Sequence, residues 1–88
     1  MIKIFETGKT YFVNGGGAIT VNKRTKNYIT VSGKTKHDTI ENKRFFVYKS
    51  NMFNLGENIL IPFSGYKALV YFCFAGHEKK EGKKQYVQ

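Results

Sequence analysis

Two short segments in the first half of the chain alternate apolar and polar side chains residue by residue. Ile19 and Val21 share one side of the chain in the first segment, and Ile29 and Val31 do so in the second. A period of two residues is typical of a β-strand that buries one face. Because only the polar run Lys23–Asn27 separates the segments, they predict an antiparallel hairpin joined by a turn. The predicted strands are Ala18–Asn22 and Tyr28–Ser32.

Glycines and polar runs divide the rest of the chain into further strand-sized segments. Nine glycines accompany a single proline, Pro62, and the stretches between them are rich in Val, Ile, Thr, Tyr and Phe. This composition is typical of short strands joined by turns. Asn14–Gly17 is expected to be a hairpin loop, and the polar segment Gly33–Asn42 a long loop. The other predicted strands are Lys9–Val13, Lys43–Ser50 and Ile59–Ile61.

The residues leave the structure of Tyr66–Ala75 open. Periodicity does not separate a strand from a helix in so short an apolar run, but its Val, Tyr, Phe and Cys content favours a buried strand. The fold class we expect is all-β and mainly antiparallel: a small SH3-like or OB-like barrel, or a rolled sheet, of five to six strands. If this segment is helical, the sheet instead packs one C-terminal helix.

The length of 88 residues predicts one domain. We expect that domain to span residues 1–76 and residues 77–88, which are charged and Lys-rich, to form a flexible tail. The start of the sequence lacks the apolar stretch of a signal peptide, and the longest apolar run, Ala68–Ala75, is far shorter than a membrane span. The expectation is therefore a cytoplasmic protein without a membrane partner.

Aromatic residues occupy both sides of the predicted strand Lys43–Ser50. Phe45 and Val47 share one face, and Phe46 and Tyr48 share the other. Either the strand is covered on both sides or it presents an aromatic face to solvent. We expect Phe46 and Tyr48 to belong to the core, and Tyr28 to be exposed.

Positive charge is concentrated in one third of the chain. The protein has 15 basic and six acidic residues, for a net charge of +9, and eight of the bases lie between Lys23 and Lys49. Such a concentration predicts an anionic partner, and lysine outnumbers arginine, which favours contact with phosphates over reading of base edges. The predicted contact residues are Lys23, Arg24, Lys26, Lys34, Lys36, Lys43, Arg44 and Lys49, with Tyr28 as a stacking residue. The alternative is that these bases serve solubility alone.

Motifs for catalysis, metal binding or cofactor binding are weak in this sequence. Gly15–Gly17 lies between predicted strands and lacks the lysine of a phosphate-binding loop. His37–Asp38 and His77–Glu78 are isolated pairs, and a single cysteine, Cys73, does not complete a zinc site. No positioned nucleophile and base are apparent. We therefore expect a non-enzymatic protein with no catalytic residues, metal or cofactor.

Three short motifs lie between residues 8 and 50: Gly8-Lys9-Thr10-Tyr11, then Lys23-Arg24-Thr25 before Ile29-Thr30-Val31, then Lys43-Arg44 with Val47. In these motifs the chain resembles small uncharacterised β-rich proteins of bacteriophages and mobile elements. Those proteins have a "GKTYY" strand, a "KRT … ITV" hairpin and a basic "KR" strand. The chain departs from that pattern where its opening strand ends in Gly15–Gly17, and Tyr66–Ala75 contains no counterpart of the usual C-terminal end of those proteins. The resemblance implies a phage or mobile-element context and carries over no functional residues.

The function we expect is a basic binding module that contacts nucleic-acid phosphates, DNA or RNA, largely independently of sequence. One alternative is a protein-interaction module, such as a phage-encoded inhibitor that binds an acidic host protein. Another is a structural or assembly protein that self-associates through an exposed aromatic face or sheet edges. The sequence does not determine the oligomeric state.

Overall fold

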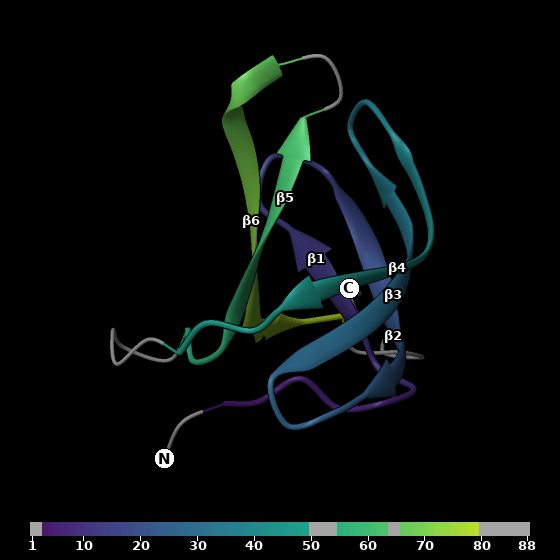
Figure 1. The fold of residues 1–88 in the computed structure, drawn as a ribbon, viewed down its shortest axis with the longest axis vertical. Helices are drawn as coiled ribbons and strands as arrows, with labels where there is room; N and C mark the ends of the chain where they lie inside the picture. Colours follow the sequence, from purple (N-terminus) through teal and green to yellow (C-terminus); the bar gives the residue numbers. More distant parts are fainter. Residues whose placement is uncertain (1–2, 50–54, 64–65, 80–88) are drawn as a thin grey trace, which may run out of the picture.

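Six antiparallel strands curl into a small, nearly closed barrel (Figure 1). The structure is a computed structural model that describes residues 3–49, 55–63 and 66–79. The sheet order is β4-β3-β2-β1-β6-β5. The strands are β1 (Thr10–Val13), β2 (Gly17–Arg24), β3 (Tyr28–Thr35), β4 (Thr39–Phe46), β5 (Asn58–Phe63) and β6 (Tyr66–Glu78).

The all-β, antiparallel expectation is confirmed, and the open question of Tyr66–Ala75 is resolved as a strand. This segment lies within β6, and no helix occurs in the described ranges. β6 also continues through His77 and Glu78, which the sequence pattern assigns to the tail. Residues 80–88 lie outside the described part of the chain, as do Ser50 and residues 51–54.

The core forms from alternate residues of most strands, whereas β4 contributes Ile40 and Phe45 with four exposed residues between them. Ile19 and Val21 of β2 and Ile29 and Val31 of β3 are buried, as their alternation predicts. Burying apolar area at about 25 cal/mol per Å² is the main source of stability for so small a domain. The core consists of Phe5, Tyr11, Val13, Ile19, Val21, Ile29, Val31, Ile40, Phe45, Val47, Ile59, Ile61, Tyr71, Cys73 and Ala75.

The expectation of a long loop at Gly33–Asn42 is wrong, because most of this segment belongs to strands. β3 continues to Thr35, β4 begins at Thr39, and residues 36–38 form a tight turn between them. The Thr35 hydroxyl accepts hydrogen bonds from the backbone N–H groups of His37 and Asp38, at 3.3 and 3.0 Å. The polar side chains of this segment are compatible with strands because one side of the sheet faces solvent.

Asn14, Gly15 and Gly16 form the expected hairpin connection between β1 and β2, and Gly17 begins β2. Gly16 donates its N–H to the carbonyl of Val13 at 3.0 Å. Gly17 has a φ of +96°, and a Cβ at this position would lie 2.0 Å from the Lys34 carbonyl oxygen. Only glycine permits this close approach of β2 to β3.

A β-bulge in β2 determines which way the two bases of that strand point. Val21 is opposite Val31, but the next opposed pair is Lys23 and Thr30, so Asn22 is the additional residue. Arg24 is then opposite the buried Ile29 and shares its inward side. Lys23 and Arg24 are therefore strand residues, and the expected turn Lys23–Asn27 begins later, at Thr25.

Arg24 forms a buried, bidentate ion pair with Glu57 at one end of the barrel. Its Nη1 and Nη2 atoms donate to the two carboxylate oxygens at 2.7 and 2.9 Å, and Glu57 is 2% exposed. Arg24 also donates to the Phe5 carbonyl at 3.2 Å, and the Phe5 N–H donates to Glu57 at 2.9 Å. Together these bonds join the end of β2, the N-terminal segment and the residue before β5. They satisfy a carboxylate that would be costly to bury alone.

The barrel remains open along one seam, between β4 and β5. In the described residues these strands are joined by an isolated bridge in which Tyr48 and Asn58 exchange two backbone hydrogen bonds of 2.8 Å. In Figure 1, β4 crosses the front of the barrel and its end points toward the base of β5. A cleft of about 420 Å³ lies at the seam and is lined by Asp38, Thr39, Ile40, Glu41, Lys43, Phe45, Ile61 and Pro62.

Cys73 is a structural thiol. It is fully buried in β6, and its Sγ donates to the Phe12 carbonyl at 3.5 Å. Burial raises the pKa of this thiol to about 12. The thiol therefore stays protonated at neutral pH and lacks the character of a nucleophile.

The first prediction concerns the Arg24–Glu57 pair. We expect Glu57→Gln to lower the free energy of unfolding by about 3 kcal/mol, because it leaves the guanidinium without its counter-charge. This is the lower end of the range for buried pairs, since the Arg24 side chain keeps 22% exposure. Urea unfolding measures the change, and Glu41→Gln, at an exposed carboxylate, is the control with an expected change within about 0.5 kcal/mol.

The second prediction concerns the pH dependence of the stability difference between the wild-type protein and Glu57→Gln. Burial raises the pKa of Glu57, but hydrogen bonds from Arg24 and from the Phe5 N–H lower it, and the net pKa lies below the usual value. A carboxylate with a lowered folded-state pKa stabilises the protein fully above its unfolded-state pKa and loses that effect as the pH falls through the folded-state value. The stability difference between wild type and Glu57→Gln should therefore shrink on acidification, and a constant difference would contradict the pairing.

Candidate functional site

The outer face of β2, β3 and β4 carries a row that crosses all three strands. Thr30 is opposite Lys23 on β2 and opposite Arg44 on β4, so all three side chains point to the same side of the sheet. Adjacent strands lie about 4.8 Å apart, so the two basic residues start about 10 Å from each other. In the described part of the chain, neither Lys23 nor Arg44 has an ion-pair partner. This row offers two uncompensated positive charges to solvent.

An aromatic–arginine cluster, made of Tyr28, Arg44, Phe46 and Tyr48, lies beside this row. The rings of Tyr28 and Phe46 meet edge to face with centroids 5.4 Å apart, and Phe46 and Tyr48 do so at 4.9 Å. The Arg44 guanidinium carbon lies 4.5 Å from the centroid of the Tyr28 ring, a cation–π contact. The cluster follows from the register, because Tyr28 is directly opposite Phe46.

The expectation that Phe46 and Tyr48 belong to the core is wrong. They are 43% and 46% exposed, while their neighbours Phe45 and Val47 take the inward positions. β4 is therefore covered on one side only. Tyr28, expected to be exposed, is half-buried because Arg44 and Phe46 lie against its ring.

Four other predicted contact residues, which are all exposed lysines, lie around the outer face at different distances from the cluster. Lys26 is exposed in the turn that leads into Tyr28, and Lys49 is exposed directly after Tyr48. Lys34 points outward, opposite Thr39, but it lies six residues along β3 from Tyr28, or about 20 Å away. Lys36 is exposed in the turn beyond it.

Two predicted contact residues point elsewhere. Arg24 is held by Glu57, which also raises the pKa of its guanidinium through their hydrogen bonds. Lys43 is opposite the buried Val31 and lines the cleft at the seam. The structure thus brings together Lys23, Tyr28 and Arg44, with Lys26 next to them.

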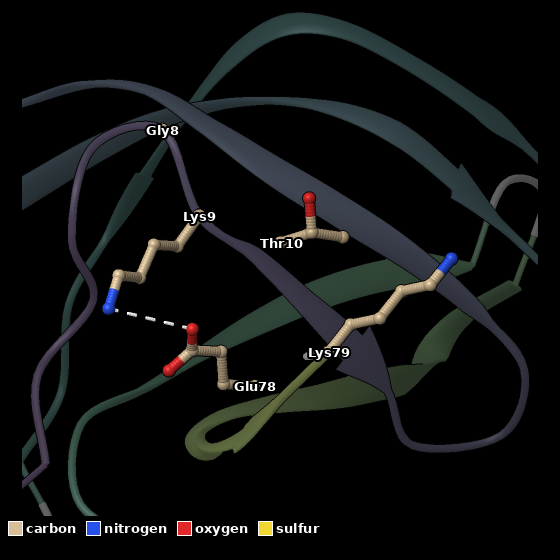
Figure 2. Close-up of a pocket in the computed structure, with 5 residues that line it drawn as sticks. All are labelled: Gly8, Lys9, Thr10, Glu78 and Lys79. Carbon is tan, nitrogen blue, oxygen red and sulfur yellow. Dashed lines mark ion pairs between the residues drawn. The ribbon is translucent and has the colours of Figure 1, made fainter. Parts of the chain in front are cut away.

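A second cleft, of about 270 Å³, lies where β1 meets the end of β6 (Figure 2). Figure 2 shows the Lys9 ammonium paired with the Glu78 carboxylate at 3.6 Å, and Lys9 also contacts Glu6 at 3.4 Å. The charges of Glu6 and then Glu78 raise the pKa of Lys9, which keeps the amine protonated. The Thr10 hydroxyl is hydrogen-bonded to that of Thr20 at 2.7 Å. Neither the Lys9 amine nor the Thr10 hydroxyl is therefore arranged as an activated nucleophile.

Sequence reasoning missed an exposed apolar strip on the outer face of β1 and β6, made of Phe12, Val70 and Phe72. Phe12 is 48% exposed, Phe72 is 42% and Val70 is 38%. The rings of Phe72 and Phe74 stack at 5.8 Å with an interplanar angle of 10°. Within β6, Tyr71 and Cys73 are buried, and Phe72 between them points outward. This alternation is present in the sequence, but an all-apolar segment conceals which half of it faces solvent.

The described residues contain no group of three or more His, Cys, Asp or Glu side chains placed to hold a metal ion. Among the same residues, no helix has the length and apolar character needed to cross a membrane. Comparisons with protein-family models, with curated proteins and with solved structures gave no match.

Proposed function

We propose that this protein is a non-enzymatic module that binds nucleic acid through its phosphates, largely independently of sequence. The observation that carries the proposal is the row on the outer face, where Lys23 and Arg44 flank Thr30 and have no ion-pair partner among the residues that the structure describes. Each phosphate that these cations neutralise releases counterions, which gives affinity without base reading. Lys26 extends the same positive region from the adjoining turn.

The overall charge supports this proposal. With a net charge of +9 on 88 residues, the positive side chains repel one another in the folded state, and binding of an anionic partner lowers this electrostatic repulsion. Beside the row, Asn22 of β2 donates to Ser32 of β3 at 2.8 Å and to Asn42 of β4 at 2.9 Å. These bonds tie the three strands together next to the cations and keep their spacing constant.

Charge reversal at Lys23 tests the proposal. Fluorescence anisotropy with labelled oligonucleotides, from about 50 to 200 mM salt, should show affinity that falls steeply with salt. We expect Lys23→Glu to weaken binding and to reduce the slope of log K against log salt by about 1, because one phosphate contact is lost.

Lys79→Glu is the matched control, since it makes the same charge change at an exposed lysine after β6. It should leave the salt slope unchanged. Equal effects of the two variants would mean that net charge, and not this face, governs binding. Absence of binding at the lowest salt would contradict the proposal as a whole.

The apolar strip favours a second candidate function, self-association. Its exposed members Phe12, Val70 and Phe72 are uncharged, and they lie on strands β1 and β6, outside the β2–β3–β4 face. Two copies that meet through their strips would bury apolar area while their basic faces stay directed outward, which limits repulsion between two chains of net charge +9.

Phe72→Lys tests this candidate by placing a charge in the strip. If the protein self-associates there, its mass in light scattering should rise with concentration, and Phe72→Lys should keep it monomeric. Phe46→Lys, at an equally exposed ring on the other face, should leave the rise unchanged. A wild-type protein that stays monomeric throughout would exclude the candidate.

A further inference from the structure

We infer that the outer face selects single-stranded nucleic acid, with bases stacking on Tyr48 and Phe46 while phosphates lie along the row from Lys23 to Arg44. This inference rests on the proposed function and adds the class of nucleic acid to it. Its basis is the aromatic–arginine cluster, whose rings contribute little to the core because Phe45 and Val47 fill the inward positions of the same segment.

The structure assigns stacking to different rings from the one that the sequence suggests. Tyr28 has one face occupied by the Arg44 guanidinium, 4.5 Å from its centroid, and the Phe46 ring lies against it at 80°. A base therefore has little room on Tyr28. Phe46 is 43% exposed to solvent and Tyr48 is 46% exposed, which leaves ring surface available to a base.

Tyr28 acts instead as a positioning residue for Arg44. An exposed arginine side chain samples many rotamers, and its contact with the ring restricts that freedom. The guanidinium is held on the outer face, with its N–H groups available to phosphate oxygens. Arg44 thus links the cationic row to the aromatic rings.

The geometry separates a line of phosphates from a line of bases. The row at Thr30 and the pair Tyr28–Phe46 are two residues apart along β3, or about 7 Å. A single nucleic-acid strand whose phosphate backbone crosses the sheet along the row can turn its bases toward Phe46 and Tyr48. The bases of a duplex are stacked on one another and present only their edges, so a duplex is limited to the phosphate contacts.

The test compares a single-stranded oligothymidylate with a duplex of the same length. We expect Tyr48→Ala to weaken single-strand binding by about 5- to 150-fold, the equivalent of about 1–3 kcal/mol for one stacked base. Binding of the duplex should change by less than about twofold, since it uses phosphates alone. Tyr48→Phe keeps the ring and should retain the wild-type preference for the single strand.

Phe72→Ala is the matched control, because it removes a ring of similar exposure from the apolar strip, and it should change neither affinity. An oligouridylate arm distinguishes RNA from DNA, and preference for either single strand over its duplex supports the inference. Equal binding of single strand and duplex, or equal losses for both in Tyr48→Ala, would overturn the inference and leave the proposed function standing. Binding of neither would overturn both.

Discussion

The ion pair between Arg24 and Glu57 holds one end of the barrel together, and the strand irregularity that forms it also directs Lys23 to the outer face. It joins β2 to the residue before β5 and fixes the N-terminal segment through two hydrogen bonds to Phe5. Phe5 is fully buried and packs edge to face on Tyr11 at 4.9 Å. A carboxylate this deeply buried is tolerated because both of its oxygens accept charged hydrogen bonds.

The β-bulge at Asn22 is what makes that pair possible. In a regular strand, alternation from the buried Val21 would turn Lys23 inward and Arg24 outward. The additional residue reverses both, so the arginine meets Glu57 and the lysine joins the outer face. The two arginines lie in different surroundings: Arg24 is held by Glu57 and the Phe5 carbonyl, and Arg44 lies over the ring of Tyr28. Both the stability of the barrel end and the charge of the outer face follow from one irregularity in the sheet.

Strict alternation made part of the fold predictable from sequence. Ile19, Val21, Ile29 and Val31 are all in the core, and the hairpin that they define is the pair β2 and β3. The loop expected at Gly33–Asn42 is wrong because polar residues are not specific to loops: in a sheet with one face in solvent, the outward residues of a strand are polar too. The irregular pairing of this segment, with a register shift between Val31 and Gly33, also breaks the period of two.

The sequence predicts which residues are candidates for the site, but not toward which side of the sheet their side chains point. Of the basic residues between Lys23 and Lys49, Arg24 and Lys43 point away from the outer face because of pairing register, which one sequence does not reveal. The partner of Arg24 lies 33 residues away in the chain, and no local pattern marks Glu57 as buried. Phe46 and Tyr48 are expected in the core if another segment covers their side of the strand, but the structure leaves that side exposed.

Mapping the binding surface by NMR tests the central claim most directly. An amide correlation spectrum of the isotope-labelled protein, titrated with a short oligothymidylate, reports which residues sense the ligand. The account predicts that shift changes concentrate on Lys23, Thr30, Arg44, Phe46 and Tyr48, with little change at Val70 or Phe72. Changes centred on the β5–β6 face, or no changes at low salt, would contradict the assignment of nucleic-acid binding to the outer face of β2, β3 and β4.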